Sequence, residues 1–476
     1  MIEVGRTSIV IRDVDENSDE YKKFERSFSF YNTVTHKYEY HTYVKIGKDI
    51  HCPAMITPEI VQTYFPNEVI TRNFVGTPRS ENINFNMIHS PKNDIQKEAL
   101  QFLTSIKNDK NKRWRMLNLA TGTGKTYVSI LAISHLQQKA LIVVDSIDLA
   151  NQWKNQFLFH TDLTEKNICI ISGLDSVEDA KENKDYKIYI SVYNTLGMLL
   201  EKDVNSLNEL NRKLKIGIRV FDESHVNFKF MCHINSLSNV NYTFFLTATP
   251  NRSDYREDIL YSKIFKNVPS YNGHKDTNEK YHTIILIKFN SQPNMKQKLS
   301  VKTKYGFSAI KWANFLTKDK AFNLYISSLF KILTTFKLID KKKKVAIMLP
   351  TIELINKTYT ELKDKYPDLD IGKFIGEIKK DKRAEELDKQ VILTNPKIFG
   401  KGIDVSDLDT VINYSQMSSK VNIEQILGRL RNNPGYSHVL IDLTDIGYPQ
   451  CINQQKTRKR FYKKVASKII DIKEIF

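Results

Sequence analysis

The chain has 476 residues and a mass of 55.4 kDa, which is enough for about three domains with large buried cores. Its composition, 41% hydrophobic and 26% charged residues, excludes an intrinsically disordered chain. Apolar runs long enough to span a bilayer and a signal-peptide pattern are both absent, so we expect a cytoplasmic protein without membrane contact.

The formal net charge is +18, from 72 basic and 54 acidic residues. Residues 1–88 contain about 10 basic and 12 acidic side chains, so the whole surplus lies in the rest of the chain. A surplus of this size predicts a polyanionic partner, most simply nucleic acid. The alternative is a lysine-rich genome bias, which would spread the charge more evenly.

Residues 1–88 are predicted to form a small N-terminal α+β domain that takes part in substrate recognition. The segments SIVIRDV, KYEYHTYVKI and EVITRNFV are rich in β-branched and aromatic residues, as strands are, and EYKKFERSF between them has helical character. The tyrosines and lysines of residues 38–48 form either a surface on which bases stack or a half-buried sheet face, and the sequence leaves both interpretations open.

Residues 89–275 are predicted to form an α/β lobe with a parallel sheet, because short apolar strands alternate there with amphipathic helices. The expected strands are RMLNLA, ALIVV, NICII, IYISV, IGIRVF and YTFFLT, and the first two precede the expected helices 124–136 and 146–157. Residues 255–282 are polar, and we expect them to form an irregular connection to the next lobe.

The segment LATGTGKT, residues 119–126, follows a strand and opens a helix. Glycines at these positions let backbone N–H groups approach and bind phosphates. Lys125 would reach the β- and γ-phosphates and Thr126 would bind Mg²⁺, so the segment predicts a nucleotide phosphate site. Leu119 stands where the first Gly or Ala of this motif is usual.

The segment VFDESH, residues 220–225, ends another apolar strand with two adjacent carboxylates. Asp222 is suited to hold Mg²⁺ through water, and Glu223 is suited to orient the attacking water during phosphate hydrolysis. Alone, this segment is also compatible with an ordinary acidic turn.

Residues 276–451 repeat the pattern of the first lobe, with expected strands TIILIKF, KVAIMLP, IGKFIG, VILTN, TVINY and HVLIDL. The chain therefore predicts two similar lobes. Residues 452–476 carry about eight basic and two acidic groups, and the spacing of Phe461, Val465, Ile469 and Ile472 predicts a basic C-terminal helix. This helix docks on a lobe, contacts nucleic acid with its outer face, or does both.

The motif series resembles superfamily 2 DExH-box helicases over residues 89–445. Beyond the two segments above, the series comprises NDIQKEAL (93–100), VVDSIDLANQW (143–153), SVYNTL (191–196), LTATP (246–250), AIMLPTIELINKTYTEL (346–362), FGKGIDV (399–405) and QILGRLR (425–431). The resemblance implies two tandem RecA-like parallel-sheet lobes behind the small N-terminal α+β domain, and an ATP hydrolase. Asp145, in the second of these segments, stands where a proline is commoner in the family.

The resemblance assigns site residues by role. The residues implied in catalysis are Lys125, Asp222, Glu223, Arg429 and Arg431. Those implied in binding ATP are Gln96, Thr121, Gly122, Thr123, Gly124, Lys125, Thr126, Gly402 and Asp404. Those implied in coupling nucleotide state to nucleic acid are His225, Thr247, Thr249 and Gln425. Mg²⁺ would be held by Thr126 and Asp222.

Two arginines of the sixth motif are candidate arginine fingers. The family pattern is often QxxGRxxR, whereas this chain has QILGRLR followed by Asn432. Arg429 is the first candidate and Arg431 the second. The alternative for either arginine is a surface ion pair, which contributes ~0–1 kcal/mol.

Two groups in the family resemble the chain most: phage branch-migration DNA helicases, which we favour, and poxviral transcript-release helicases. The resemblance implies ATP and Mg²⁺ as cofactors and DNA (single-stranded, forked or branched) as partner, with RNA and the replication or transcription machinery as further candidates. The first functional hypothesis is an ATP-dependent helicase that unwinds or branch-migrates DNA in replication, recombination or repair. The second is a nucleic-acid-stimulated ATPase that releases transcripts or remodels protein–nucleic-acid complexes without processive unwinding.

Overall fold

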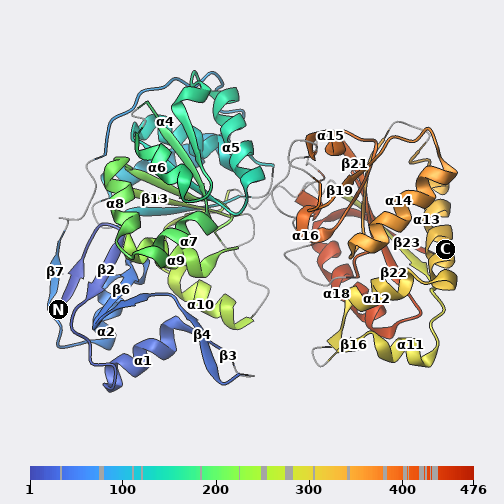
Figure 1. Ribbon diagram of the computed structural model, residues 1–476, viewed down its shortest axis with the longest axis horizontal. Coiled ribbons are helices and arrows are strands. Elements are labelled where there is room, and N and C mark those ends of the chain that lie inside the picture. Colours follow the sequence, from blue (N-terminus) through green and yellow to red (C-terminus); the bar gives the residue numbers. More distant parts are fainter. Residues whose placement is uncertain are drawn as a thin grey trace. The chain divides into compact units, whose positions relative to one another are not determined.

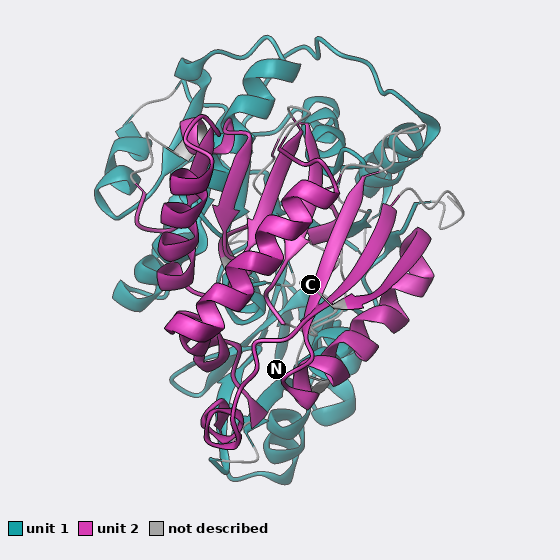
Figure 2. Cartoon of the chain, turned by 90° about the vertical axis from the view of Figure 1, so that its right-hand side faces the viewer, with its two compact units in different colours: residues 1–275 teal, residues 276–476 magenta. Residues whose placement is uncertain are grey.

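The structure is a computed structural model. It describes residues 1–32, 35–73, 80–109, 112–119, 122–182, 185–224, 226–247, 255–273, 282–303, 306–339, 343–378, 383–399, 405, 407–416, 423, 426–428, 430 and 438–475. The chain divides into two compact units, Met1–Lys275 and Asp276–Phe476 (Figure 2). Within the described residues, no helix has both the length and the apolar character needed to cross a bilayer.

Unit 1 is built around a seven-stranded parallel sheet in the order β10-β11-β9-β12-β13-β8-β14. Its strands are β8 (Trp114–Asn118), β9 (Ala140–Val144), β10 (Ile168–Ile171), β11 (Ile188–Val192), β12 (Ile218–Phe221), β13 (Tyr242–Thr247) and β14 (Ser270–Tyr271). All five residues of β9 are buried, as expected for a strand covered on both faces. The six strands expected in this region are confirmed.

Helices cover both faces of this sheet (Figure 1). One face packs against α3 (Asp94–Thr104), α4 (Lys125–Leu136) and α5 (Ile147–His160), and the other against a larger group of helices. That group comprises α6 (Asp175–Glu182), α7 (Tyr193–Lys202), α8 (Ser206–Lys213), α9 (Phe228–Leu237) and α10 (Tyr255–Phe265). Short 3₁₀ helices span Ala54–Ile56, Ser105–Asn108 and Glu165–Asn167.

The N-terminal part of unit 1 forms a mixed five-stranded sheet in the order β5-β6-β2-β1-β7. Its elements are β1 (Ile2–Val4), β2 (Ser8–Ile11), α1 (Asp19–Phe28), β5 (Val44–Ile46), β6 (Asp49–Pro53), α2 (Pro58–Tyr64) and β7 (Ile70–Arg72). A separate hairpin pairs β3 (Ser29–Asn32) with β4 (Lys37–His41). In the tyrosine-rich segment, Tyr43 is 2% exposed and Tyr40 stacks on Phe30, which favours the half-buried sheet face over a stacking surface for bases.

The N-terminal sheet shares one hydrophobic core with the α9–α10 face of the parallel sheet. Polar contacts fix this junction: Thr7 Oγ1 donates to the Ser238 carbonyl at 3.0 Å, and Tyr40 Oη donates to Glu257 Oε1 at 2.6 Å. Burial lowers the pKa of His233, whose Nε2 lies 2.9 Å from the His41 carbonyl, to about 4. Residues 1–73 therefore pack as part of unit 1, and a functional boundary at residue 88 stays a prediction.

The expectation of an irregular connection over residues 255–282 is wrong for residues 255–271, and residues 274–281 lie outside the described residues. Residues 255–265 form α10, and residues 270–271 form β14, which pairs with β8 at the edge of the sheet. The signal was present in the sequence, because Leu260 and Ile264 lie one helical turn apart and both are buried in the core.

Unit 2 contains a second seven-stranded parallel sheet in the order β19-β20-β18-β21-β22-β15-β23. Its strands are β15 (His282–Phe289), β18 (Lys344–Met348), β19 (Ile371–Phe374), β20 (Val391–Thr394), β21 (Leu408–Asn413), β22 (Val439–Asp445) and β23 (Ala466–Ile475). The six strands expected in this region are confirmed. The fold class expected from the sequence, two tandem RecA-like lobes with a small N-terminal α+β part, is therefore confirmed.

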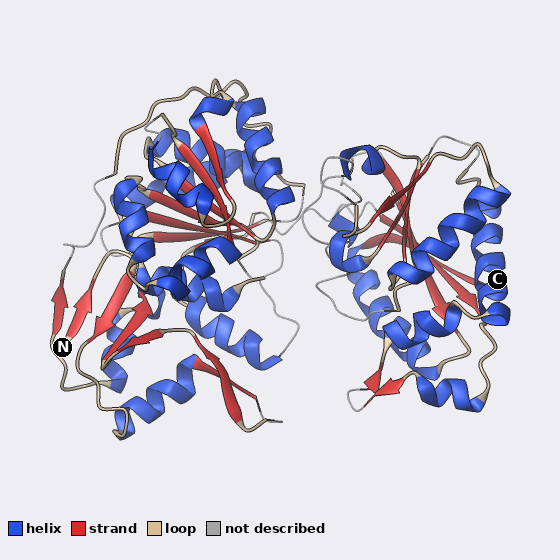
Figure 3. Cartoon of the chain, in the orientation of Figure 1, coloured by secondary structure: helices blue, strands red, loops and turns tan. Residues whose placement is uncertain are grey.

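Helices also cover both faces of the second sheet (Figure 3). One face packs against α12 (Ala309–Leu316), α13 (Asp319–Thr335) and α14 (Ile352–Lys365), and the other includes α16 (Pro396–Phe399) and α18 (Pro449–Val465). The remaining elements are α11 (Met295–Ser300), β16 (Lys302–Thr303), β17 (Gly306–Phe307) and α15 (Arg383–Leu387).

The expectation of a helix through residue 476 is correct only as far as Val465. Residues 466–475 form β23, which pairs in parallel with β15 and completes the edge of the sheet. Ile469 and Ile472 fit a helical spacing, but the hydrogen-bonding edge of β15 makes the extended conformation the better one for this segment.

Candidate nucleotide-binding site

The glycine-rich segment joins the end of β8 to the start of α4. Gly122 and Gly124 have φ angles of +80° and +94°, a region that glycine enters without a steric penalty. Lys125 is the first residue of α4 and is 9% exposed, and its Nζ donates to the Leu119 carbonyl at 2.9 Å. The lysine ammonium therefore lies across the loop whose backbone would surround a phosphate.

Gln96, on α3, contacts this loop directly. Its Nε2 donates to the Thr123 carbonyl at 3.2 Å, and its Oε1 accepts from the Lys92 N–H at 2.8 Å. A Cβ atom on Gly124 would lie 2.6 Å from Gln96 Nε2, so a glycine is needed for this close approach. Gln96 and the glycine-rich segment, which the sequence analysis assigned to one site, are therefore in direct contact in the structure.

The two carboxylates of the DESH segment follow β12. Asp222 is half-buried, and its oxygens accept from the Trp153 indole N–H at 2.8 Å and from the Glu223 backbone N–H at 3.0 Å. Loss of hydration and the adjacent Glu223 carboxylate raise the pKa of Asp222 to about 6, although the Trp153 hydrogen bond and the Lys125 charge act in the opposite direction. Glu223 has a φ of +46°, which is strained for a non-glycine residue.

These groups meet at one edge of the sheet, because the carboxyl ends of parallel strands lie together. The Leu119 N–H donates to the carbonyl of Thr247, the last residue of β13, at 3.2 Å, and the Ser224 N–H donates to the Leu246 carbonyl at 2.9 Å. Thr126 lies in the first turn of α4. Unit 1 therefore gathers the predicted residues Gln96, Gly122, Thr123, Gly124, Lys125, Thr126, Asp222, Glu223 and Thr247.

The other predicted site residues lie outside the described residues. They are Thr121, His225, Thr249, Gly402, Asp404, Gln425, Arg429 and Arg431. Their roles stay predictions.

Sequence reasoning did not identify two side-chain contacts that hold the DESH turn. Trp153 on α5 donates to Asp222, and Asn227 Nδ2, just after the turn, donates to Asp145 Oδ1 at 2.8 Å. One hydrogen bond joins the 143–153 segment to the DESH segment, and the other joins it to the residue two positions after that segment. A tryptophan at a buried helix position was the available signal, since a buried indole N–H usually has an acceptor.

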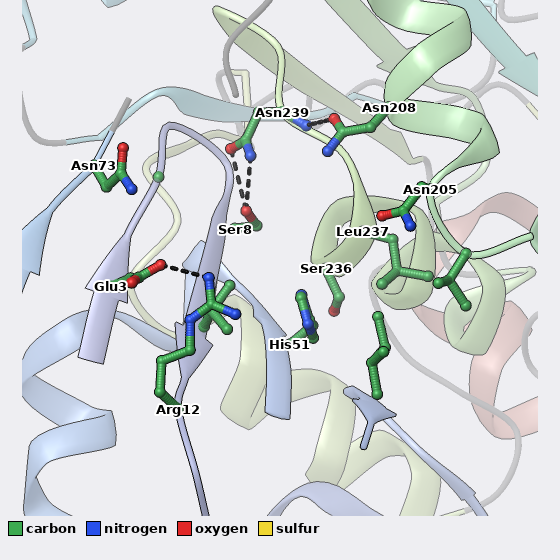
Figure 4. Close-up of a pocket in the computed structure, with 14 residues that line it drawn as sticks. Glu3, Ser8, Arg12, His51, Asn73, Asn205, Asn208, Ser236, Leu237 and Asn239 are labelled. Atoms are coloured by element: carbon green, nitrogen blue, oxygen red, sulfur yellow. Dashed lines mark hydrogen bonds and ion pairs between the residues drawn. The ribbon is translucent and has the colours of Figure 1, made fainter. Parts of the chain in front are cut away.

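A cavity of about 200 Å³ lies elsewhere in unit 1, between the N-terminal sheet and helices α8 and α9 (Figure 4). Arg12 donates to Glu3 at 2.8 Å on one wall, and Asn239 Nδ2 donates to Ser8 Oγ at 2.9 Å on another. The cavity shares no residue with the glycine-rich loop or the DESH turn, so it is separate from the nucleotide site.

The fold and the site define a P-loop nucleotide-binding protein with two RecA-like lobes. Two family profiles match the chain: the family described as "Type III restriction enzyme, res subunit" matches residues 90–252, and "Helicase conserved C-terminal domain" matches residues 326–433. Together they cover more than half of the chain. The chain belongs to superfamily 2 of the helicases, and it is an ATP-dependent enzyme of that superfamily.

Relatives of known name are viral and cellular. Transcript termination protein A18 of Yaba monkey tumor virus is 25% identical over 360 residues, which are 70% of this chain and 69% of the viral protein. The DNA 3'-5' helicase XPB of Mycobacterium tuberculosis is 30% identical over 151 residues, 31% of this chain and 25% of XPB. The poxviral group expected from the sequence is thus found among the relatives, and the preferred phage-type relationship stays a prediction.

A solved structure of yeast Dbp5 (S. cerevisiae) bound to RNA and ADP BeF3 is similar to the chain in fold. It matches with a TM-score of 0.54 and 16% sequence identity, over 80% of this chain and 89% of that one. The restriction-enzyme family profile matches the first lobe only.

Proposed function

We propose that the chain is an ATP-dependent DNA helicase or translocase that unwinds or branch-migrates DNA in replication, recombination or repair. One observation carries this proposal: Lys125, Asp222, Glu223 and Gln96, which are far apart in the sequence, gather around one loop at the carboxyl edge of a parallel sheet. A phosphate-binding lysine beside two carboxylates is the minimal set of groups for metal-assisted hydrolysis of a nucleoside triphosphate.

The residues of the site fit a magnesium ion. Loss of hydration and the adjacent Glu223 carboxylate raise the pKa of Asp222, and a divalent cation would relieve the repulsion between the two carboxylates. Thr126 and Asp222 would hold Mg²⁺, which neutralises charge on the phosphates when it is bound. Glu223 would orient the attacking water, and Lys125 would exchange the Leu119 carbonyl for a phosphate oxygen.

The remaining roles follow the family resemblance. Gln96 would read the adenine base, and Gly402 and Asp404 would contribute to ATP binding. Arg429, or Arg431, would stabilise the charge that develops on the transferred phosphoryl group, an effect of about 10³–10⁵ in rate. Thr247, Thr249, His225 and Gln425 would couple the nucleotide state to nucleic acid. An intracellular location is part of the same proposal.

DNA is the preferred substrate in this proposal. The XPB relative is named as a DNA helicase, and the net charge of +18 is suited to a polyanion. RNA stays a candidate.

A second candidate function is the release of transcripts from a stalled polymerase without processive unwinding. It is favoured by the A18 relative, which is named as a transcript termination protein and aligns over 70% of this chain.

One experiment separates these functions. ATP hydrolysis is measured side by side with single-stranded DNA, forked DNA, four-way DNA and RNA, and strand separation is followed on the forked and four-way substrates. Stimulation by DNA together with product strands supports the helicase. Stimulation without product strands favours the transcript-release factor, and hydrolysis unaffected by any nucleic acid contradicts both.

A further inference from the structure

Residues 290–318 of unit 2 form a segment that is basic throughout. They contain six lysines (residues 296, 298, 302, 304, 311 and 318) and no aspartate or glutamate. No nucleotide-site motif falls within this segment, which follows β15 directly. We call residues 290–318 the basic segment.

The basic segment folds into α11, the short β16–β17 hairpin and α12, which lie together at one end of unit 2 (Figure 1). Three large apolar side chains are exposed there: Met295 is 73% exposed, Leu299 57% and Ile310 62%. Met295 and Leu299 are four residues apart on α11 and therefore share one face of that helix. The surface therefore offers lysine side chains for charged contacts and exposed aliphatic side chains for apolar contacts.

The basic segment is firmly anchored on the sheet. The buried carboxylate of Asp445, the last residue of β22, accepts from the Trp312 indole N–H at 2.9 Å and from the Ser291 N–H at 3.2 Å. It also accepts from the Ser291 hydroxyl and from the Gly447 N–H. One carboxylate thus fixes the first residues of the segment and its second helix, so the exposed groups are held by a rigid support.

Three lysines of the basic segment differ from Lys331 and Lys389, two lysines elsewhere in unit 2 that pair with carboxylates. Lys331 pairs with Glu474 at 2.5 Å, and Lys389 pairs with Asp370 at 3.1 Å. Within the described part of the chain, Lys296, Lys302 and Lys311 are exposed and form no ion pair with a carboxylate. Their positive charge is therefore available to an external anion.

We propose that the basic segment is a nucleic-acid contact surface that engages the point where a duplex opens. This inference rests on the proposed function. The lysines of α11, the hairpin and α12 bind backbone phosphates, and this binding releases counterions from the nucleic acid. Met295 and Leu299 pack against an exposed base pair, because unbranched and branched aliphatic side chains are used as wedges between base steps. A protein partner is less suitable, since the described residues of the segment include no acidic side chain and no fully exposed aromatic one, whereas protein interfaces combine both charges with aromatic anchors.

The test of the phosphate contacts uses K296Q/K302Q and the control K331Q/K389Q. Both double variants remove two positive charges from unit 2, and only the first removes them from the basic segment. Affinity for forked DNA is measured against salt concentration. We expect the first variant to lower the slope of log K against log salt by about 2, since each lost phosphate contact removes about 0.9. We expect the control to keep the wild-type slope.

The test of the apolar contacts uses M295S/L299S, which leaves every charge in place. The salt slope should stay at the wild-type value, and strand separation on forked DNA should slow by about tenfold at unchanged ATP hydrolysis with single-stranded DNA. Thermal melting of each variant verifies that it is folded. The altered side chains are exposed, so we expect Tm values equal to that of the wild type.

The outcomes separate this inference from the proposed function. If nucleic acid does not stimulate ATP hydrolysis by the wild-type chain, the proposed function fails. If the wild-type chain is stimulated and binds forked DNA, but K296Q/K302Q has the same salt slope as K331Q/K389Q, the contact surface is overturned. Wild-type strand separation by M295S/L299S would overturn the apolar contact.

Discussion

The indole N–H of Trp153 donates a 2.8 Å hydrogen bond to Oδ2 of Asp222, the carboxylate that we propose to hold Mg²⁺. Trp153 is 1% exposed and lies on α5, and Asp222 follows β12. The Glu223 N–H binds the other oxygen of the same carboxylate. Hydrogen bonds from the protein therefore orient both carboxylate oxygens of Asp222 without a metal ion.

Replacing Trp153 with phenylalanine should weaken the site while the protein stays folded. The ring is largely retained, but Asp222 loses one donor, and a hydrogen bond to a charged group contributes about 1.5–3 kcal/mol. We expect the Mg²⁺ concentration needed for half-maximal ATP hydrolysis to rise by about tenfold or more, since about 1.4 kcal/mol corresponds to tenfold. A titration of ATPase activity with Mg²⁺ measures this shift.

Trp114 provides the matched control for this variant. It lies in the same unit, is 5% exposed, and its indole N–H has no acceptor among the described residues. W114F makes the same change in size without removing a hydrogen bond. Equal Mg²⁺ requirements in W153F and W114F would contradict the role of Trp153.

Replacing Asp222 with asparagine should stabilise the nucleotide-free protein at neutral pH. The pKa of Asp222 is about 6 in the folded protein and ordinarily 3.8, so the folded state holds this proton more tightly than the unfolded state. As pH rises from about 4 to 6, only the unfolded chain loses this proton, and the free energy of unfolding therefore falls. Above pH 6 the loss of stability is complete. Asparagine carries no such cost.

Thermal melting without nucleotide and metal measures this effect. We expect D222N to melt at a higher temperature than the wild type at pH 8, by roughly 3 °C, and to lose this advantage at pH 4. A lower melting temperature for D222N at pH 8 would show that the carboxylate is stabilised by its neighbours.

Replacing Gly124 with alanine should damage nucleotide binding more than the same change at Gly122. Both residues have positive φ, so both variants are strained. Only at Gly124 would the new methyl group also displace Gln96, because its carbon atom would lie 2.6 Å from Gln96 Nε2. Affinity for a fluorescent ATP analogue measures the difference, and equal losses in G122A and G124A would contradict the role of the Gln96 contact.

Two substitutions separate binding from hydrolysis. K125A should abolish ATP hydrolysis and leave binding of nucleic acid largely intact, because the lysine faces the phosphate loop. E223Q should still bind ATP but not turn it over, because glutamine keeps the size of the side chain and cannot act as a base. Steady-state ATPase assays and filter binding of labelled DNA measure both effects, and hydrolysis by K125A at the wild-type rate would remove the phosphate-loop assignment.

Deleting residues 1–88 should destabilise the whole of unit 1. Phe24 and Phe28 of α1 belong to the same hydrophobic core as Met231 and Ile234 of α9, so the deletion would expose apolar surface. Size-exclusion chromatography and thermal melting should detect association or a lower Tm. A monodisperse fragment with full ATPase activity would instead support an independent N-terminal domain.

The sequence allowed both parallel sheets and the core of the nucleotide site to be predicted, because their signals are local. A buried parallel strand is a short apolar run, and the phosphate loop is a fixed pattern of glycines before a lysine. The spacing of Gln96 and Lys125 could be read along the chain, and these residues do contact the same loop.

The features that were missed depend on partners that are distant in the sequence. Residues 466–475 fit a helix by spacing and become a strand because β15, almost 200 residues earlier, offers an edge. The hydrogen bond of Trp153 depends on Asp222, which is 69 residues away. Single-sequence patterns carry no information about which such pairs meet.

The position of β15 determines when unit 2 can fold on the ribosome. This strand comes first along unit 2, yet its two neighbours in the sheet, β22 and β23, are the last two strands to be synthesised. The last described strand of unit 1, β14, is complete once residue 271 has emerged. Unit 1 can therefore fold during translation, whereas the sheet of unit 2 is completed only after β23 has been synthesised.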